Sequence, residues 1–254
     1  MKYSKFKKDI THQSSIPYEN GFLKPSHLVE HPNPEISLVD AILTRRSSRA
    51  YSDQLVSAEL FHWIINIASN SPTACNEQQW RIVNIQEEKT IQELYLRGSA
   101  AFLKNTKQCF LVCYNKKNDN PFWFDYIQSA SAFVSYFQLV AHSVGVGSCW
   151  ICHLPNKSEL KRLFNIHKNY EPVCLVSYGF YRGKTLMVPR KHDTHKIVME
   201  EKFNSSDLIF KSHRKRVRRL LLRFLYYKIP SFIRKKIRKK SVKFEKKFYY
   251  EKFD

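Results

Sequence analysis

Three arginines and two serines occupy consecutive positions, in the order Arg45-Arg46-Ser47-Ser48-Arg49. They follow residues 38–43, a short apolar stretch that we expect to form a helix. Arginine suits phosphate binding, because its planar guanidinium donates two parallel hydrogen bonds to two oxygen atoms. Adjacent arginines at a helix end can also be plainly solvated, so this segment alone leaves phosphate binding and solvation both open.

A second polar segment occupies residues 71–81. Pro72 opens it, and because the residue before a proline is disfavoured in the α-helical region, the preceding helix should end here. The segment carries the amides of Asn76 and Gln78. An amide side chain offers a donor and an acceptor together, which is what the pyrimidine edge of a flavin requires. Capping of the next element is the alternative role for both amides.

Three short motifs together make the chain similar to the nitroreductase family of FMN enzymes. The sequence RRSSR at 45–49 resembles the family's RRSxR, and SPTACNEQQW at 71–80 resembles its SPTxxNxQxW. The sequence GVGSCWI at 145–151 is similar to the family's GLGSxWI turn. The resemblance covers about residues 36–200.

This resemblance implies an α+β fold of nitroreductase type, a mixed and mainly antiparallel sheet wrapped by helices, in a homodimer with FMN at the subunit interface. It also implies hydride transfer from NAD(P)H and reduction of a small acceptor, such as a nitro compound, a quinone or a dedicated metabolite. Such chemistry belongs to the cofactor, and the sequence shows no convincing Ser/His/Asp arrangement. The alternative function is a non-catalytic, flavin-binding or degenerate scaffold recruited to a membrane or an anionic partner.

The resemblance assigns the FMN phosphate to Arg45, Ser47 and Arg49, with Arg190 returning from far along the chain. Arg46 is a weaker candidate, with its backbone along the ribityl chain. For Arg190, a solvated loop charge remains the alternative. All of these side chains or their backbones are therefore expected around one cofactor.

The resemblance assigns the flavin ring to Asn76 and Gln78, and flavin N5 or O4 to backbone N–H groups at Cys152 and His153. The family often has small residues at these last two positions, so the side chains present here would crowd the face where substrate stacks. His153 could donate a proton, because histidine titrates near neutral pH; a structural histidine is the alternative. Cys149 and Cys152 lack a second ligand pair at zinc spacing, so no metal is expected.

Composition indicates one sizeable globular domain with appended segments. The 254 residues are 43% hydrophobic, enough for a large core. No apolar run is long enough for a transmembrane helix, and no apolar region of a secretory signal follows the charged N-terminus. Three of the six cysteines lie in apolar, strand-like stretches, and we expect a reducing, cytoplasmic setting.

The formal charge of +21 is concentrated near the C-terminus, where residues 205–254 carry 18 Lys and Arg against four Asp and Glu. We therefore expect an N-terminal arm over residues 1–35, the FMN domain over residues 36–204, and a basic amphipathic tail over residues 205–254.

The tail should form a helix from Lys211 to Lys228 that Pro230 interrupts, with leucines and a phenylalanine opposite arginines. Such helices lie on anionic membrane surfaces, here the inner face of the membrane. A solvated or partner-packed helix is the alternative. Nucleic acid is the less favoured partner, because the apolar stripe would then stay exposed.

The spacing of hydrophobic residues predicts the remaining helices and strands. Further helices are expected over residues 58–70, 87–97, 125–144 and 156–164, and strands over 81–85, 108–114 and 172–180. Ser57 should cap the first of these helices, and Asp125 the third. That third helix has two apolar faces, which favours a second packing partner and hence the homodimer. Gly145 should end it, and residues 150–153 should form a turn.

Overall fold

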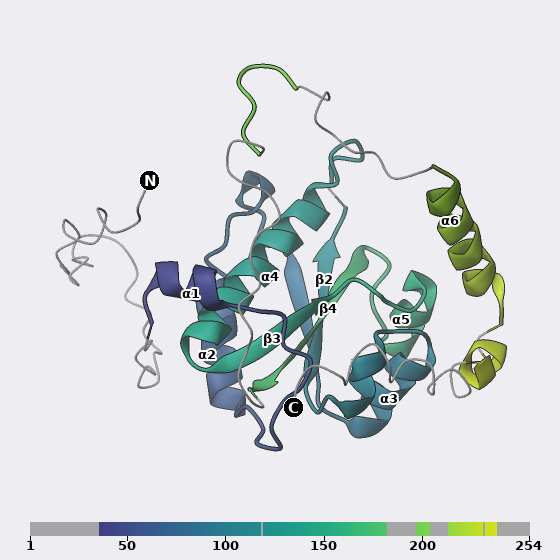
Figure 1. Cartoon of the computed structure of the whole chain (residues 1–254), viewed down its shortest axis with the longest axis horizontal. Coiled ribbons are helices and arrows are strands. Elements are labelled where there is room, and N and C mark those ends of the chain that lie inside the picture. The colour runs from purple at the N-terminus through teal and green to yellow at the C-terminus, as the bar shows by residue number, and fades with distance from the viewer. Residues whose placement is uncertain (1–35, 118, 182–196, 204–212, 231, 238–254) are drawn as a thin grey trace. The chain divides into compact units, whose positions relative to one another are not determined.

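The computed structural model describes residues 36–117, 119–181, 197–203, 213–230 and 232–237, all within the unit Asn33–Asp254. In chain order the elements are α1 (Leu38–Thr44), α2 (Ala58–Ala68), η2 (Ala74–Asn76), β1 (Trp80–Ile85), α3 (Glu88–Leu96), η3 (Ala101–Asn105), β2 (Cys109–Asn115), α4 (Asp125–Ser143), β3 (Val146–Ile151), α5 (Lys157–Leu163), β4 (Tyr170–Phe180) and α6 (His213–Lys228) (Figure 1). Residues 232–237 are also helical. The arm predicted over residues 1–35, and Arg190, lie outside the described residues.

The four strands form one sheet in the order β1-β2-β4-β3, and all neighbouring strands are antiparallel. Ser47 adds an isolated parallel bridge to Ser148 of β3. The sheet is therefore mixed and mainly antiparallel, and the predicted α+β class is confirmed.

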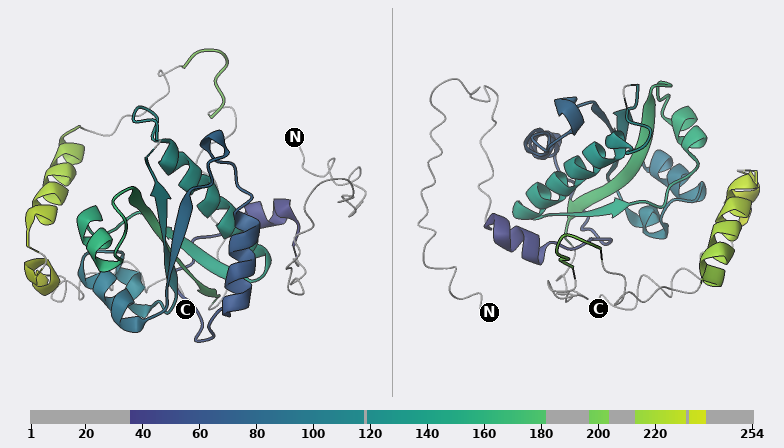
Figure 2. Two further views of the ribbon diagram at one scale, coloured as in Figure 1. Left: turned by 180° about the vertical axis from the view of Figure 1, so that it is seen from behind. Right: turned by 90° about the horizontal axis from the view of Figure 1, so that it is seen from above.

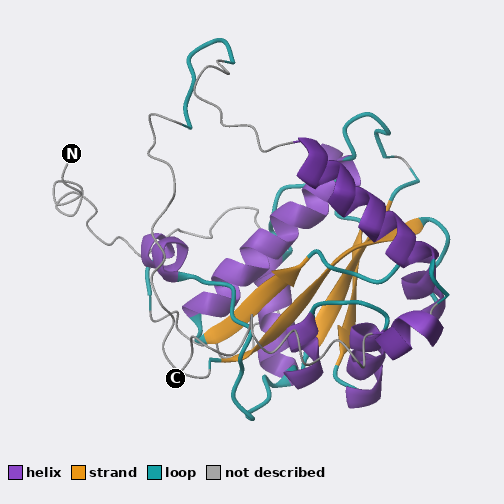
Figure 3. Ribbon diagram, turned by 45° about the vertical axis from the view of Figure 1, so that its right-hand side comes forward, coloured by secondary structure: helices purple, strands orange, loops and turns teal. Residues whose placement is uncertain are grey.

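Helices cover both faces of this sheet (Figures 2 and 3). On one face α2 and α4 pack against the strands through a cluster that includes Phe61, Ile64, Phe110, Val112, Phe133, Phe137 and Tyr178. On the other face α3, η3 and α5 pack through a cluster that includes Ile91, Leu94, Leu103, Leu111, Leu160 and Leu175. Strand β2 contributes to both clusters, which explains its nearly unbroken apolar sequence.

One predicted element is wrong: Trp150 and Ile151 end a strand and do not form a turn. The glycine and serine in β3 lower its intrinsic strand preference, but pairing with β4 decides the structure. Gly147 lies opposite Gly179 in that pairing. Only residues 152–153, just beyond the strand, lie in a loop.

Two predicted helix caps are confirmed and one is wrong. The Ser57 side chain accepts a hydrogen bond from the Leu60 N–H at the start of α2, and Gly145, with a φ of 77°, follows the end of α4. Asp125 does not cap α4, because the helix begins after Phe124 in a left-handed conformation. That turn directs the Tyr126 N–H toward Asp119 Oδ1, 2.9 Å away.

Candidate functional site

The arginine-rich segment that follows α1 lies along the free edge of β3. Ser48 donates its N–H to the Ser148 carbonyl at 2.9 Å, and Ser47 forms the parallel bridge to the same residue. A second bridge pairs Tyr51 with Tyr181. Backbone hydrogen bonds therefore fix the path of residues 45–51, which we call the arginine cradle.

Gly147 lets the cradle approach the sheet this closely. A Cβ atom at this position would lie 2.8 Å from the Tyr181 ring and 3.0 Å from Ser48 Cβ. Real Cβ atoms do not tolerate such contacts, so a larger residue would push the cradle off β3. The glycine in the third sequence motif is thus explained by the packing of the first motif.

A chain of hydrogen bonds fastens α1 to the end of α4. The Thr44 hydroxyl donates to the Asp40 carbonyl at 2.6 Å, so toward His142 Nε2, 2.8 Å away, it accepts. His142 therefore carries its proton on Nε2, and its Nδ1 accepts from the Tyr181 hydroxyl at 2.6 Å. Burial raises the pKa of Tyr181 to about 12 despite the nearby charge of Arg45, so the hydroxyl keeps its proton at neutral pH.

The positive charges of the cradle act on shared neighbours. Burial lowers the pKa of His142, and the charges of Arg45 and Arg46 lower it further. Burial raises the pKa of the Cys149 thiol, and the charges of Arg49 and Arg45 partly offset that rise. Guanidiniums therefore converge on one edge of β3, where their combined potential suits an anion.

Two polar side chains of the cradle are exposed to a ligand. Ser47 and Arg49 are exposed, and the Arg49 guanidinium lies 5.9 Å from the centre of the Phe102 ring. Within the described part of the chain, no carboxylate forms a salt bridge with Arg49. Arg45 is half-buried at the C-cap of α1, while Arg46 turns back to donate to the Leu43 carbonyl at 2.9 Å. The donor set of the cradle fits a phosphate, and the roles of Arg45, Arg46, Ser47 and Arg49 toward FMN stay predictions.

The predicted amide pair lies in a constrained loop after α2. Cys75, Asn76 and Gln78 all have positive φ angles, between 49° and 54°. Gln78 Nε2 donates to Asn76 Oδ1 at 2.7 Å, and both side chains are exposed. The pair therefore still offers the Asn76 amide N–H groups and the Gln78 carbonyl, for which no described residue is a partner. A donor beside an acceptor fits the edge of a flavin ring.

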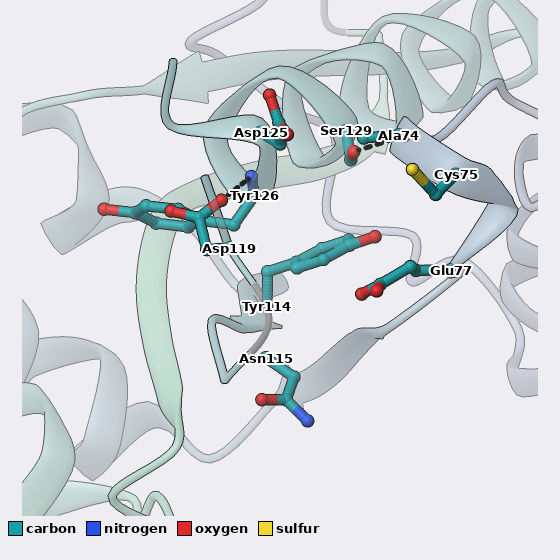
Figure 4. A pocket seen from close by; sticks show the side chains of 9 residues that line it. All are labelled: Ala74, Cys75, Glu77, Tyr114, Asn115, Asp119, Asp125, Tyr126 and Ser129. Atoms are coloured by element: carbon teal, nitrogen blue, oxygen red, sulfur yellow. Dashed lines mark hydrogen bonds between the residues drawn. The ribbon is translucent and has the colours of Figure 1, made fainter. Parts of the chain in front are cut away.

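A small pocket lies behind this loop, between η2 and the start of α4 (Figure 4). Its volume of about 40 Å³ is enough for a water molecule. The Tyr114 hydroxyl extends into it from the end of β2 and is buried, with no hydrogen-bond partner among the described residues. We therefore interpret this pocket as part of the support of the loop.

Cys152 and His153 are exposed in the loop that follows β3. The backbone there is held from behind, because the wholly buried Ser99 donates its hydroxyl to the His153 carbonyl at 3.0 Å. The described residues contain no cluster of three or more His, Cys, Asp or Glu side chains arranged to bind a metal. The proposed roles of Cys152 and His153 toward the flavin stay predictions.

The structure brings the cradle together but separates it from the amide loop. Thr44, which directly precedes the cradle, contacts His142 near the end of α4, whereas the loop contacts Ser129, whose hydroxyl accepts from the Ala74 N–H at 3.1 Å. These two positions are about 20 Å apart along the axis of α4, at 1.5 Å per residue. A single ligand would have to span much of α4 to reach both sites in one chain.

Sequence reasoning missed three residues that support the site: His142, Tyr181 and Ser99. The first two orient the cradle, and Ser99 supports the loop at His153. His142 lies within α4, Tyr181 directly follows β4, and Ser99 follows the turn after α3. A polar side chain in a buried stretch was the available signal, because such groups need partners.

Comparison with known proteins identifies the relatives of this chain. The family model described as the Nitroreductase family matches residues 42–126 and 95–180. A protein of Archaeoglobus fulgidus, provisionally assigned as an NADH dehydrogenase/NAD(P)H nitroreductase, is 30% identical over 147 residues, which cover 55% of this chain and 82% of that protein. The FMN reductase (NADPH) of Bacillus subtilis is 23% identical over 140 residues, covering 48% of this chain and 56% of that protein.

Solved structures agree on the fold. An FMN-dependent nitroreductase from Clostridium difficile has a TM-score of 0.57 at 24% identity, over 65% of this chain and 99% of that chain. A nitroreductase-like family protein from Bacillus cereus has a TM-score of 0.57 at 19% identity, over 66% and 97% of the two chains. The family match covers more than half of the sequence and contains both the cradle and the amide loop, and the chain belongs to the nitroreductase family.

Proposed function

We propose that the chain is an FMN-dependent oxidoreductase that takes hydride from NAD(P)H and reduces a small acceptor. The observation that carries this proposal is the arginine cradle, in which Arg45, Ser47 and Arg49 lie on a backbone fixed to the edge of β3. A backbone that is already fixed in this way lowers the ordering cost when the arginine side chains bind a phosphate. A nitro compound, a quinone or a dedicated metabolite is the proposed acceptor.

Bound FMN would supply two-electron chemistry at its N5. The chain's own residues would bind and orient it: the cradle and Arg190 hold the phosphate, and Asn76 and Gln78 pair with the ring edge. Cys152 and His153 flank the face that substrate approaches, which narrows the slot. His153 is the proposed proton donor, since it is exposed on a backbone that Ser99 fixes.

A homodimer is part of this proposal. The cradle and the amide loop contact opposite ends of α4, and a two-fold axis can place the cradle of one subunit against the amide loop of the other. The outer face of α1 supports such an interface, because Leu38, Val39, Ile42 and Leu43 are each about half exposed or more. A contiguous exposed apolar surface of this kind typically marks a protein interface.

The decisive test is the colour and redox behaviour of the purified protein. We expect a yellow dimer whose flavin absorption bleaches when NADH or NADPH is added without oxygen. Yellow protein that stays oxidised with both nucleotides would favour the alternative, a non-catalytic flavin-binding scaffold. A colourless monomer that ignores added FMN would refute the proposal.

A second proposed role, peripheral membrane association, is favoured by the orientation of α6. Val217, Leu221, Phe224 and Leu225 lie on one face of this helix, and each is more than half exposed. Tyr226, on the opposite side, packs against Gly98 of the core. The sequence from 208 to 244 contains no Asp or Glu. An exposed apolar face with basic flanks fits an anionic bilayer surface, at the inner face of the membrane in a cytoplasmic protein.

No helix in the described ranges has the length and apolar content to cross a membrane. Vesicle flotation tests surface binding instead, with phosphatidylglycerol vesicles against neutral phosphatidylcholine vesicles. We expect the full chain to float only with the anionic vesicles. The double substitution L221E/F224E should abolish this, while L55E, at a similarly exposed leucine of the core surface, should not. Equal flotation of both variants would end the membrane hypothesis.

A further inference from the structure

The C-terminal segment is fastened to the core by a buried ion pair. An Arg234 guanidinium nitrogen lies 2.6 Å from Glu159 Oε1, and the two side chains are only 4% and 5% exposed. Arg234 Nε also donates to the Ile229 carbonyl at 2.9 Å. A buried charge is tolerated only when it is paired and hydrogen-bonded, so this contact has a fixed geometry.

Neighbouring tail residues contact the end of α3 beside this pair. Lys235 Nζ lies 2.6 Å from Glu93 Oε1, which also accepts from Arg97. The Tyr226 ring packs so closely on Gly98 that a Cβ atom there would lie 3.0 Å from the tyrosine hydroxyl. The tail thus contacts the turn at residues 97–99 as well as Glu159.

Both regions of the core that the tail contacts, Glu159 and the turn at residues 97–99, are hydrogen-bonded to the loop after β3. Glu159 belongs to the capping box of α5, and its Oε2 accepts from the Asn156 N–H at 3.4 Å. Ser99, at the end of the α3 turn, donates to the His153 carbonyl. The loop of residues 152–156 is therefore held at two points. Tail residues contact one support, Glu159, directly, and they contact Arg97 and Gly98, which directly precede the other support, Ser99.

We propose that Arg234 is a positioning residue for the cofactor site: its pair with Glu159 holds residues 152–156 in the conformation that a flavin meets. The inference rests on the proposed function, because residues 152–156 include Cys152 and His153, which are expected beside the flavin ring. Arg234 does not touch the cofactor. Arg234 lies beyond the family match, which ends at residue 180. This way of holding the loop is therefore specific to chains with such a tail.

Hydrogen exchange of the full-length protein without added FMN tests the positioning itself. In R234Q and in E159Q, exchange in a peptide covering 149–156 should accelerate by roughly tenfold or more, the scale of one charge-assisted hydrogen bond. Exchange in β2 should be unchanged. K236Q is the matched control, because it removes the same charge from an exposed side chain in the same stretch. Unchanged exchange at 149–156, or equal acceleration everywhere, would overturn the inference.

Flavin binding supplies the second measurement. R234Q should raise the FMN Kd several-fold and shift the flavin midpoint potential, and K236Q should do neither. If the wild-type protein binds no FMN, the proposed function fails, while the exchange data still decide whether Arg234 positions the loop. Should R234Q fail to fold, the neutral pair R234M/E159Q removes the charge of both partners together. Wild-type exchange at 149–156 in that folded double variant would refute the role.

Discussion

The two ends of α4 bind their neighbouring segments in different ways. At the C-terminal end, the cradle is joined to β3 by backbone hydrogen bonds and to His142 through Thr44. At the N-terminal end, the amide loop is attached through Ser129, and its two amides bond to each other. The cradle is therefore held by hydrogen bonds to the sheet. The amide loop has residues with positive φ angles and keeps its amide side chains exposed.

This difference matches what each segment would hold. A phosphate carries concentrated negative charge, so it binds more tightly where cations are already in position. The edge of a flavin ring needs a hydrogen-bond donor and an acceptor side by side. The two amides of the loop can bond to each other until a ligand binds. The following substitutions test whether the two segments differ in this way.

The largest effect is expected from the double substitution R45A/R49A. Each guanidinium contributes charge-assisted hydrogen bonds of about 1.5–3 kcal/mol, so the FMN Kd should rise by 100-fold or more. The melting temperature should change little, because the backbone bonds of the cradle remain. Fluorescence titration measures the Kd, and R81A, an exposed arginine on β1, is the matched control. Retained flavin in the double variant would contradict the phosphate assignment.

The substitution G147A should affect stability more than any single change in the amide loop. Its new Cβ would meet Tyr181 and Ser48 within 3.0 Å, which should lower the free energy of unfolding by about 1–3 kcal/mol. Denaturant unfolding provides the measurement. A variant as stable as the wild type would mean that the cradle can move away from β3 at little cost.

Changes in the amide loop should weaken binding without weakening the fold. N76A or Q78A removes about one neutral hydrogen bond to the ligand, worth about 1 kcal/mol, so the FMN Kd should rise roughly fivefold. Both side chains are exposed, and the melting temperature should stay within error. A large loss of stability would show that the amides are structural caps, the alternative left open by the sequence.

The smallest effect concerns pH. Because the pKa of His142 is lowered in the folded protein, by burial first and then by Arg45 and Arg46, the unfolded chain takes up the proton first. Stability should therefore be constant above about pH 6.5, the unfolded pKa of histidine, and decrease as the pH falls below it. H142Q, whose amide can still donate and accept, should lessen that decrease by less than about 1 kcal/mol. Urea unfolding between pH 5 and 8 measures this, with H62Q at an exposed histidine as the control.

Much of the fold was predictable because its strongest patterns are local. The apolar run of β2 and the three- and four-residue spacing of α4 each indicate their structure without reference to distant residues. Strand β3 was not predictable in this way, since its glycine and serine form a strand only through pairing with β4. The cap at Asp119 depends on a left-handed Phe124, which no sequence rule requires.

The site was predictable to the extent that its residues belong to short motifs. Arg45, Ser47 and Arg49 belong to one motif and lie along one edge of the sheet, while their binding of a phosphate stays a prediction. The need of His142 for a partner could be inferred from its place in an apolar helix, but its partners could not, because Thr44 and Tyr181 are 98 and 39 residues away. The same holds for the buried pair of Arg234 and Glu159, separated by 75 residues. Arg190 stays a prediction.

The bridge between Ser47 and Ser148 also bears on the solubility of the protein. β3 is the last strand of its sheet, and an open strand edge is a template on which other chains can pair and aggregate. Residues 47–48 occupy part of that edge. A proteolytic nick that released residues 47–48 would expose this part of the edge of β3, so damage to the arginine cradle would promote aggregation of the protein.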